Sequence, residues 1–285
     1  MVSAVDIKKE VMSYGVKMTG AQYEWRETKG KGIKIGIVDT GIDLKHEDLE
    51  IKNCINFTDE DRSDVEDKAG HGTHVAGIVG ARMNGKGVVG VAPECELYIA
   101  KAFDGQGRGD KKCVIKSLEW MLMNEVDIIN MSFSSSEEDK DEEEMVNRCI
   151  ENNIFMVAAA GNRGERRVTY PGRYKGVVAV SSVDINKIKS EFSSYGNEID
   201  LAAAGVDILS TYKNNSYAVL SGTSMAAPLI SGAAALIQAK ALKRFKRKLT
   251  PKELEVVMGI YADNTDVGRK SKCCGCGIFS FGRIN

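Results

Sequence analysis

The feature of this sequence that most constrains its fold is a series of short apolar runs separated by segments of helical length. Successive strand residues point to opposite faces, so a continuously apolar strand needs both faces of its sheet buried. Parallel sheets covered by helices on both sides meet that need. We therefore predict a three-layer α/β/α domain around a doubly wound, mainly parallel sheet. The predicted strands are 33–38, 97–103, 126–131, 154–160 and 177–183, and the predicted helices are 71–81, 112–124, 142–152 and 223–245.

The overall charge of the chain is nearly balanced. Its 39 Lys and Arg residues offset 40 Asp and Glu residues, which leaves a formal net charge of -1. This balance provides no general attraction to nucleic acid or to an anionic membrane. The basic stretch 240–248 falls at the predicted end of a helix, where cations are favoured; a nucleic-acid patch is the alternative. We predict neither a nucleic-acid nor a membrane partner.

The start of the chain and its cysteines both indicate a cytoplasmic protein. Charged residues at positions 6 and 8–10 interrupt the N-terminus before the apolar core of a secretion signal could form. No apolar run approaches the roughly 18 to 20 residues of a membrane span. Seven cysteines, an odd number, suit reduced thiols better than a set of disulfides. Cys273, Cys274 and Cys276 lie close together, so a metal-binding role for them is an alternative.

Three motifs place reactive side chains at the ends of predicted elements. The motif VDTG puts Asp39 at the end of the first strand, and GHGTH and GTSMA put His71 and Ser224 at helix starts. A serine hydroxyl becomes a strong nucleophile only when an adjacent imidazole removes its proton. A buried carboxylate on the other imidazole nitrogen fixes the tautomer and stabilises the imidazolium. The sequence therefore predicts Ser224 as nucleophile, His71 as general base and Asp39 as its orienting group.

A fourth residue, Asn162, follows the predicted strand 154–160 in the motif AGN. Acyl transfer passes through a tetrahedral intermediate whose oxyanion needs hydrogen-bond donors. The amide of Asn162 and the backbone N–H at the helix start near Ser224 are suitable donors. We therefore predict Asn162 as an oxyanion donor.

These motifs, in the order Asp, His, Ser, resemble the subtilase (subtilisin-like) family. The segments IINMSF at 128–133 and YPG at 170–172 extend the resemblance, which covers about residues 32 to 285. It implies a subtilisin-like fold and a serine endopeptidase that forms an acyl-enzyme intermediate and requires no cofactor for catalysis. In a subtilisin itself, loss of the asparagine donor costs about 3 to 4 kcal/mol of transition-state stabilisation.

The remaining histidines and a nearby serine are given lesser roles. His74 would lie one helical turn from His71, and we predict a structural role for it. His46 falls in a loop that is expected to be exposed. Ser221 is the weaker nucleophile candidate, because Ser224 occupies the helix-start position of the motif.

The resemblance also implies that a protein or peptide substrate lies extended between two backbone edges, as an added strand. The family usually has glycine at position 134, so Ser134 predicts a narrower or more polar wall of the S1 subsite. The predicted substrate-binding residues are Gly107, Arg108, Gly109, Ser132, Phe133, Ser134, Gly161 and Arg163.

Basic residues gather near these predicted subsites, namely Arg163, Arg166, Arg167 and Lys111. Because arginine pairs well with carboxylates, a preference for acidic peptide side chains is a hypothesis. The alternative is that these residues are solvated or pair with Glu165.

A calcium site is predicted from the same resemblance. Asp48 and Asn84, in and near the loop 82–88, supply oxygens of the kind that Ca²⁺ takes, with main-chain carbonyls completing the shell. Arg82 and Lys86 place positive charge nearby. The predicted role is structural and not catalytic.

The chain is divided into a short N-terminal extension, residues 1–30, and a catalytic domain, residues 31–285. The short extension and the thiols resemble the intracellular branch of the family, where such an extension can occlude the cleft. Self-inhibition by residues 1–30 is therefore a hypothesis, and packing of residues 11–25 on the domain surface is its alternative. Processing of one leader peptide, or a binding role without catalysis, are the competing functions.

Overall fold

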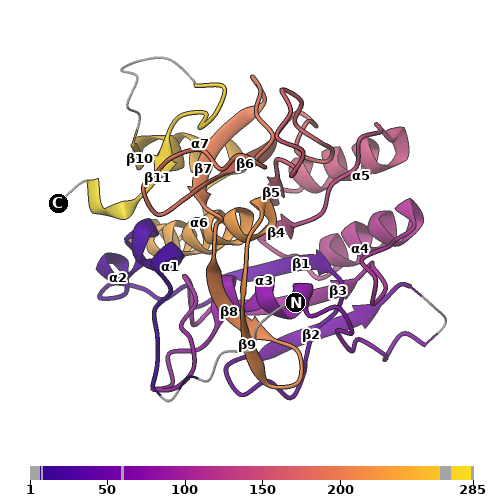
Figure 1. Cartoon of the computed structure of the whole chain (residues 1–285), viewed down its shortest axis with the longest axis horizontal. Helices are drawn as coiled ribbons and strands as arrows, with labels where there is room; N and C mark the ends of the chain where they lie inside the picture. The colour runs from indigo at the N-terminus through magenta and orange to yellow at the C-terminus, as the bar shows by residue number, and fades with distance from the viewer. Residues whose placement is uncertain (1–6, 8, 59–60, 264–270, 284–285) are drawn as a thin grey trace.

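A nine-stranded sheet forms the centre of the computed structural model, which describes residue 7 and residues 9–58, 61–263 and 271–283. The order is β10-β11-β7-β6-β5-β4-β1-β3-β2, and only the β10–β11 pair is antiparallel (Figure 1). A hairpin, β8–β9, stands apart from this sheet. The strands are β1 Lys34–Asp39, β2 Ile51–Asn56, β3 Glu96–Lys101, β4 Ile128–Met131, β5 Phe155–Ala159, β6 Val177–Val183, β7 Ile199–Ala204, β8 Ile208–Tyr212, β9 Ser216–Leu220, β10 Ala262–Asp263 and β11 Ile278–Phe279.

Helices cover both faces of this sheet. One core cluster joins Ile35 and Ile37 of β1 to α3, α6 and α7, and another joins Val38 to α4 and α5. The alternation along β1 thus feeds two cores, which is why its apolar run is continuous. Figure 1 shows α4 and α5 together at one side and α6 through the centre. The helices are α1 Tyr14–Thr19, α2 Ala21–Glu24, α3 His71–Gly80, α4 Lys111–Met123, α5 Lys140–Glu151, α6 Thr223–Phe245 and α7 Pro251–Ile260, with a 3₁₀ turn η1 at Phe281–Arg283.

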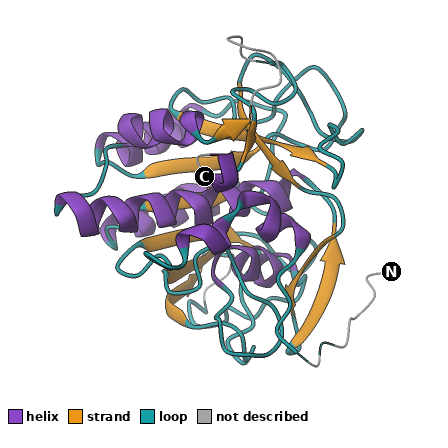
Figure 2. Ribbon diagram, turned by 90° about the vertical axis from the view of Figure 1, so that its left-hand side faces the viewer, coloured by secondary structure: helices purple, strands orange, loops and turns teal. Residues whose placement is uncertain are grey.

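The long helix α6 is the central helix of the domain (Figure 2). It contacts β1, β4, β5, β6 and β7 as well as α1, α2, α3 and α7. By length and composition α6 alone, among the described residues, could cross a membrane, but 89% of its apolar window is buried inside the molecule. Small residues allow this dense packing: a Cβ on Gly232 would lie 2.6 Å from Cβ of Val91.

The described part of the predicted extension packs on the domain. The backbone N–H groups of Glu10 and Val11 donate to the carbonyls of Gly85 and Gly87, at 3.3 and 2.7 Å. Farther along, α1 packs against β7 and α6, and α2 packs against η1 and α6. Residues 11–25 therefore pack on the domain, as the alternative to self-inhibition predicted.

The C-terminal end of α6 holds α2 through ion pairs. Lys240 lies 2.7 Å from Glu24, and the guanidinium of Arg244 binds Glu27 at 2.6 and 2.7 Å. In the same basic stretch, Arg247 pairs with Glu253 at 2.8 Å and Lys248 with Asp127 at 2.6 Å. Much of the positive charge between 240 and 248 is thus neutralised within the chain.

The predicted fold class is confirmed, and the nine predicted elements all occur with bounds shifted by at most a few residues. The sequence pattern missed β2, β7 and the hairpin β8–β9. Strand β2 lies at the edge of the sheet and is partly exposed, so it lacks a continuous apolar run. Helix α7 was also missed, although Thr250 and Glu253 form a capping box at its start.

Candidate active site

The four predicted catalytic residues come from four segments that meet at the carboxyl edge of the sheet. Asp39 is the last residue of β1, and Asn162 follows the end of the nearby strand β5. His71 is the first residue of α3, and Ser224 is the second residue of α6. Because β1, β4 and β5 are parallel neighbours, the loops that follow them meet at one edge.

Asp39 and His71 are in direct contact. Nδ1 of His71 lies 2.7 Å from Oδ1 of Asp39, and the same oxygen accepts the N–H of Thr40 at 2.8 Å. The Asp39 side chain is 3% exposed, whereas that of His71 is 32% exposed. With Nδ1–H donated to the carboxylate, Nε2 of His71 is the nitrogen that can accept a proton.

The protonation of His71 is set by opposing effects. Burial opposes the charged form, but the charge of Asp39, its hydrogen bond and the charge of Asp67 outweigh burial and raise the pKa of His71. A raised pKa stabilises the imidazolium that forms when the imidazole accepts a proton from a nucleophile. The electrostatic environment therefore suits a general base.

Ser224 lies at the positive end of α6, beside β4. Its Oγ donates a hydrogen bond to the carbonyl oxygen of Ser132 at 3.0 Å, and the described residues include no hydrogen bond between Ser224 and His71. Catalytic hydrogen bonds are often made only in the substrate complex. To transfer its proton to His71, the hydroxyl has to leave the Ser132 carbonyl.

The amide of Asn162 is held in one orientation. Its Oδ1 accepts two hydrogen bonds from Thr223, from the backbone N–H and from Oγ1, each at 2.9 Å. The Nδ2 group therefore remains available as a donor. It lies beside Gly222, where a Cβ would come within 3.4 Å of Nδ2. This geometry suits an oxyanion donor next to the start of α6.

The other histidines are both structural in position. Nε2 of His74 bonds the carbonyls of Ile208 and Ala218, at 3.0 and 3.2 Å, and burial lowers its pKa to about 3. The prediction of an exposed His46 is wrong: it is 2% exposed. Its Nε2 bonds the Ser216 carbonyl at 2.9 Å and its ring packs edge-on against Tyr217. The local sequence around His46 indicates only a loop, because the residues that bury its side chain belong to the distant hairpin β8–β9.

The weaker nucleophile candidate, Ser221, is engaged elsewhere. Its Oγ accepts the N–H of Asp207 at 2.8 Å and donates to the Asp207 carboxylate at 3.2 Å. These bonds hold the end of the hairpin β8–β9. Ser221 thus has a local structural partner, while Ser224 faces the segment after β4.

The two predicted substrate edges follow β3 and β4, which flank β1. The rings of Phe103 and Phe133 pack across the gap between these segments, with centroids 5.0 Å apart. Arg108 is bound to Asp104 at 3.0 Å, so it is not a free cation. Of the remaining predicted residues, Gly107, Gly109 and Ser134 are exposed, and Ser132 and Gly161 are buried.

The basic residues near the predicted subsites differ in their partners. Lys111 pairs with Asp139 at 3.3 Å, which neutralises it. Arg167 bonds a main-chain carbonyl, that of Ser136, at 3.4 Å. Arg163 and Arg166 are exposed, and no ion pair with Glu165 is present in the described part of the chain.

The predicted calcium residues, Asp48 and Asn84, are in contact. Asp48 is fully buried, and its carboxylate accepts hydrogen bonds from Asn84 Nδ2 (3.0 Å), Val88 N (2.8 Å) and Tyr217 Oη (3.0 Å). All three donors are neutral, so the carboxylate charge has no cationic partner among the described residues. A buried anion of this kind, beside an amide, is compatible with a hard cation.

No cluster of three or more His, Cys, Asp or Glu side chains suited to a metal occurs within the ranges that the structure describes. Any calcium at Asp48 would therefore depend on main-chain oxygens. The same finding gives no support to the metal-binding alternative for Cys273, Cys274 and Cys276. The other four cysteines, Cys54, Cys95, Cys113 and Cys149, are free thiols.

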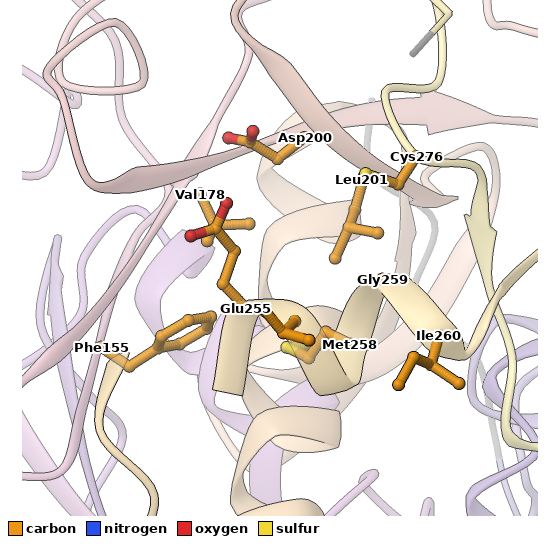
Figure 3. A pocket seen from close by; sticks show the side chains of 10 residues that line it. Phe155, Val178, Asp200, Leu201, Glu255, Met258, Gly259, Ile260 and Cys276 are labelled. Atoms are coloured by element: carbon orange, nitrogen blue, oxygen red, sulfur yellow. The ribbon is translucent and has the colours of Figure 1, made fainter. Parts of the chain in front are cut away.

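A cavity of about 350 Å³ lies at the opposite edge of the sheet (Figure 3). Phe155, at the start of β5, Leu201 of β7 and Met258 of α7 line it. Since Asn162 follows the other end of β5, this cavity is separate from the candidate catalytic residues. The cavity therefore does not mark the active site.

One functional candidate had no signal in the sequence. The Asp67 carboxylate, four residues before His71, is 2% exposed and accepts four hydrogen bonds. It lies at the end of a charged stretch whose composition is typical of a solvent-exposed loop. Only the three-dimensional contacts distinguish it from its exposed neighbours.

Comparison with known proteins agrees with this geometry. The model of the subtilase family matches residues 30–277. The chain is 42% identical over 250 residues to an intracellular serine protease of Paenibacillus polymyxa, covering 84% of this chain and 77% of the relative. It is 41% identical over 254 residues to the major intracellular serine protease of Bacillus subtilis (84% and 79%), and 39% identical over 236 residues to subtilisin DY of Bacillus licheniformis (81% and 86%). The chain therefore belongs to the subtilase family and is a serine endopeptidase.

Proposed function

We propose that this endopeptidase cleaves peptide bonds through Ser224, His71, Asp39 and Asn162. Nε2 of His71 takes the hydroxyl proton of Ser224 while Oγ attacks the substrate carbonyl carbon. The resulting oxyanion accepts hydrogen bonds from Asn162 Nδ2 and from the N–H of Ser224. Asp39 keeps Nδ1–H in place and stabilises the imidazolium.

The second half of the reaction reverses these proton movements. His71 gives its proton to the leaving amine, the C–N bond breaks, and the acyl group remains on Ser224. A water then attacks the acyl carbon as His71 takes one of its protons. Return of that proton to Oγ releases the carboxylic acid product. The observation that carries this proposal is the 2.7 Å contact between Nδ1 of His71 and Oδ1 of Asp39.

A fluorophosphonate probe tests the proposal directly. Peptide mapping by mass spectrometry should locate the adduct on Ser224, and His71→Ala should abolish labelling. Ser221→Ala is the matched control and should be labelled normally, because Ser221 is bonded to Asp207. An unlabelled Ser224 in folded protein would favour the non-catalytic binding role instead.

We further propose that the substrate is an extended peptide held between segments 107–109 and 132–134. Arg163 and Arg166, which are exposed and form no ion pair with any described residue, support a preference for acidic side chains near the scissile bond. The neutralised Lys111 adds nothing to it. A peptide library cleaved no better at Asp or Glu than at Leu would contradict this preference.

A structural calcium at Asp48 and Asn84 is also a proposal, supported by the buried Asp48 carboxylate, which has no cationic partner within the described ranges. Calcium would neutralise this carboxylate and hold the loop 82–88, with no part in the chemistry. Added Ca²⁺ should raise the thermal unfolding midpoint of the chelator-treated enzyme, and Asp48→Asn should remove that response. Equal midpoints with Ca²⁺ and with chelator would contradict the site.

We further propose self-inhibition by the N-terminal extension, residues 1–30, of which residues 1–6 and 8 lie outside the part of the chain that the structure describes. Residues 10 and 11 are bonded to the loop that follows α3. Eight extended residues span up to about 26 Å, and the ten residues of α3, from His71 to Gly80, span about 15 Å. Removal of residues 1–8 should then raise kcat/KM, whereas Glu10→Ala in the truncated protein should add nothing further.

A cytoplasmic location completes the proposal. It is supported by the names of the intracellular relatives and by the free thiols of Cys54, Cys95, Cys113 and Cys149. Fractionation of the producing cells, with detection of the protein in each fraction, tests it.

A further inference from the structure

We propose that Asp67 is a positioning residue of the catalytic site, which fixes His71 relative to Asp39 through hydrogen bonds to the backbone around both. The proposal rests on the catalytic roles proposed above. The Asp67 carboxylate bonds Thr40, Gly70 and Thr73, so its effect on the reaction should pass through the placement of Asp39 and His71.

One carboxylate oxygen of Asp67 connects the two catalytic segments. Oδ1 accepts the hydroxyl of Thr40, the residue next to Asp39, at 2.8 Å. The same oxygen accepts the N–H of Gly70, the residue before His71, at 2.7 Å. Loss of this acceptor oxygen would therefore alter the position of the end of β1 relative to the start of α3.

The other oxygen and the Thr40 hydroxyl complete the connection. Oδ2 of Asp67 accepts both the N–H and the hydroxyl of Thr73, each at 2.7 Å. Oγ1 of Thr40 in turn accepts the N–H of Gly72 at 3.0 Å. The backbone is thus held at residues 70, 72 and 73, on both sides of His71.

The burial of Asp67 fits a positioning role. It is 2% exposed and forms no ion pair with any residue that the structure describes. Four short hydrogen bonds keep its charge in place. A neutral side chain of similar size would satisfy only part of this set, because an amide brings donors where two of these donors already point.

Asp67 also acts on His71 by its charge. The groups that face His71 are Asp39, Asp67 and His74, and His74 is neutral because burial lowers its pKa to about 3. The charge of Asp67 adds to that of Asp39 in favouring the imidazolium. Removal of this charge should therefore move the acid limb of the kcat/KM profile to lower pH.

The test is Asp67→Asn, compared with Asp64→Asn as a matched control. Asp64 lies in the same loop and carries the same charge, but its weak contacts are with Glu66 N at 3.3 Å and Lys68 at 3.8 Å. Asp67→Asn should lower kcat per titrated site by up to about 100-fold and leave KM nearly unchanged. It should also move the acid limb of the kcat/KM profile to lower pH. Asp64→Asn should change none of these quantities.

Two further results keep the inference separate from simple unfolding and from the catalytic proposal. Fluorophosphonate titration counts assembled sites, so a lower titre with unchanged kcat per site and an unchanged acid limb would overturn the positioning role. If Asp67→Asn does not fold, Thr40→Val should lower kcat and Thr40→Ser should recover it; equal kcat for the two variants would overturn the inference. Failure of wild-type Ser224 to react would instead refute the proposed catalytic roles.

Discussion

The orientation of Asn162 by Thr223 gives a prediction that can be followed quantitatively. Oγ1 of Thr223 donates to Asn162 Oδ1 at 2.9 Å and accepts the N–H of Gly161 at 3.2 Å. Thr223→Val keeps the shape of this buried side chain and removes both bonds. The amide of Asn162 retains one bond, from the Thr223 backbone N–H.

The two lost bonds have different consequences. One neutral hydrogen bond contributes about 1 kcal/mol, which corresponds to roughly a fivefold change in the ratio of aligned to misaligned amide. The kcat should therefore fall by at most about fivefold, far less than the ~100- to 1,000-fold loss measured when the asparagine donor of a subtilisin is removed. The unpaired, buried N–H of Gly161 should lower the free energy of unfolding by about 1 to 3 kcal/mol.

Steady-state kinetics on a chromogenic peptide and urea denaturation of the probe-inactivated enzyme separate these effects. Thr223→Ser keeps the hydroxyl and should recover most of both losses. A Thr223→Val enzyme with lower stability but wild-type kcat would refute the idea that this hydroxyl orients Asn162. A loss as large as that of Asn162→Ala would show that the backbone N–H alone cannot hold the amide.

Three other predictions follow from contacts described above or from the packing of α3. Burial opposes protonation of His71, but the charges of Asp39 and Asp67 outweigh it and raise the pKa, so kcat/KM should rise with pH through a pKa above the ordinary histidine value of about 6.5. Protonated His71 also stabilises the fold: this contribution is complete below the ordinary pKa of the unfolded state and is lost as the pH rises through the raised pKa of the folded state. Gly77→Ala should lower the thermal midpoint despite a better helix propensity, since the new Cβ would lie 2.1 Å from Oγ1 of Thr211; an unchanged midpoint would mean that the hairpin yields. Lys240→Gln should destabilise the protein by at most about 1 kcal/mol in denaturation curves, and the loss should shrink at high salt, because its pair with Glu24 is partly exposed.

The proposed catalytic residues could be assigned from sequence because their motifs combine residue type with position. Asp39 ends an apolar run and His71 follows a glycine, so both the chemistry and the strand or helix end are visible locally. The fold class was equally accessible, since the runs that form β1 and β5 are buried on both faces. Local pattern and tertiary structure agree at these positions.

Other features depend on contacts between distant parts of the chain. His46 is buried by Ser216 and Tyr217 of β9, which no local pattern places beside it. Asp67 resembles the solvated acids around it until its bonds to Thr40 and Thr73 are known. The burial of His46 and Asp67 depends on contacts with distant segments, which neither residue propensity nor hydrophobic periodicity can predict.

The central position of α6 has a consequence for how variants of this enzyme should be interpreted. The helix that carries Ser224 near its start also packs against five strands of the sheet and four other helices. A molecule that has not assembled α6 into the core therefore lacks the proposed nucleophile at the carboxyl edge of the sheet. Residual turnover in a destabilised variant should accordingly count intact molecules in an all-or-none mixture, rather than report a population in which every site is partly impaired.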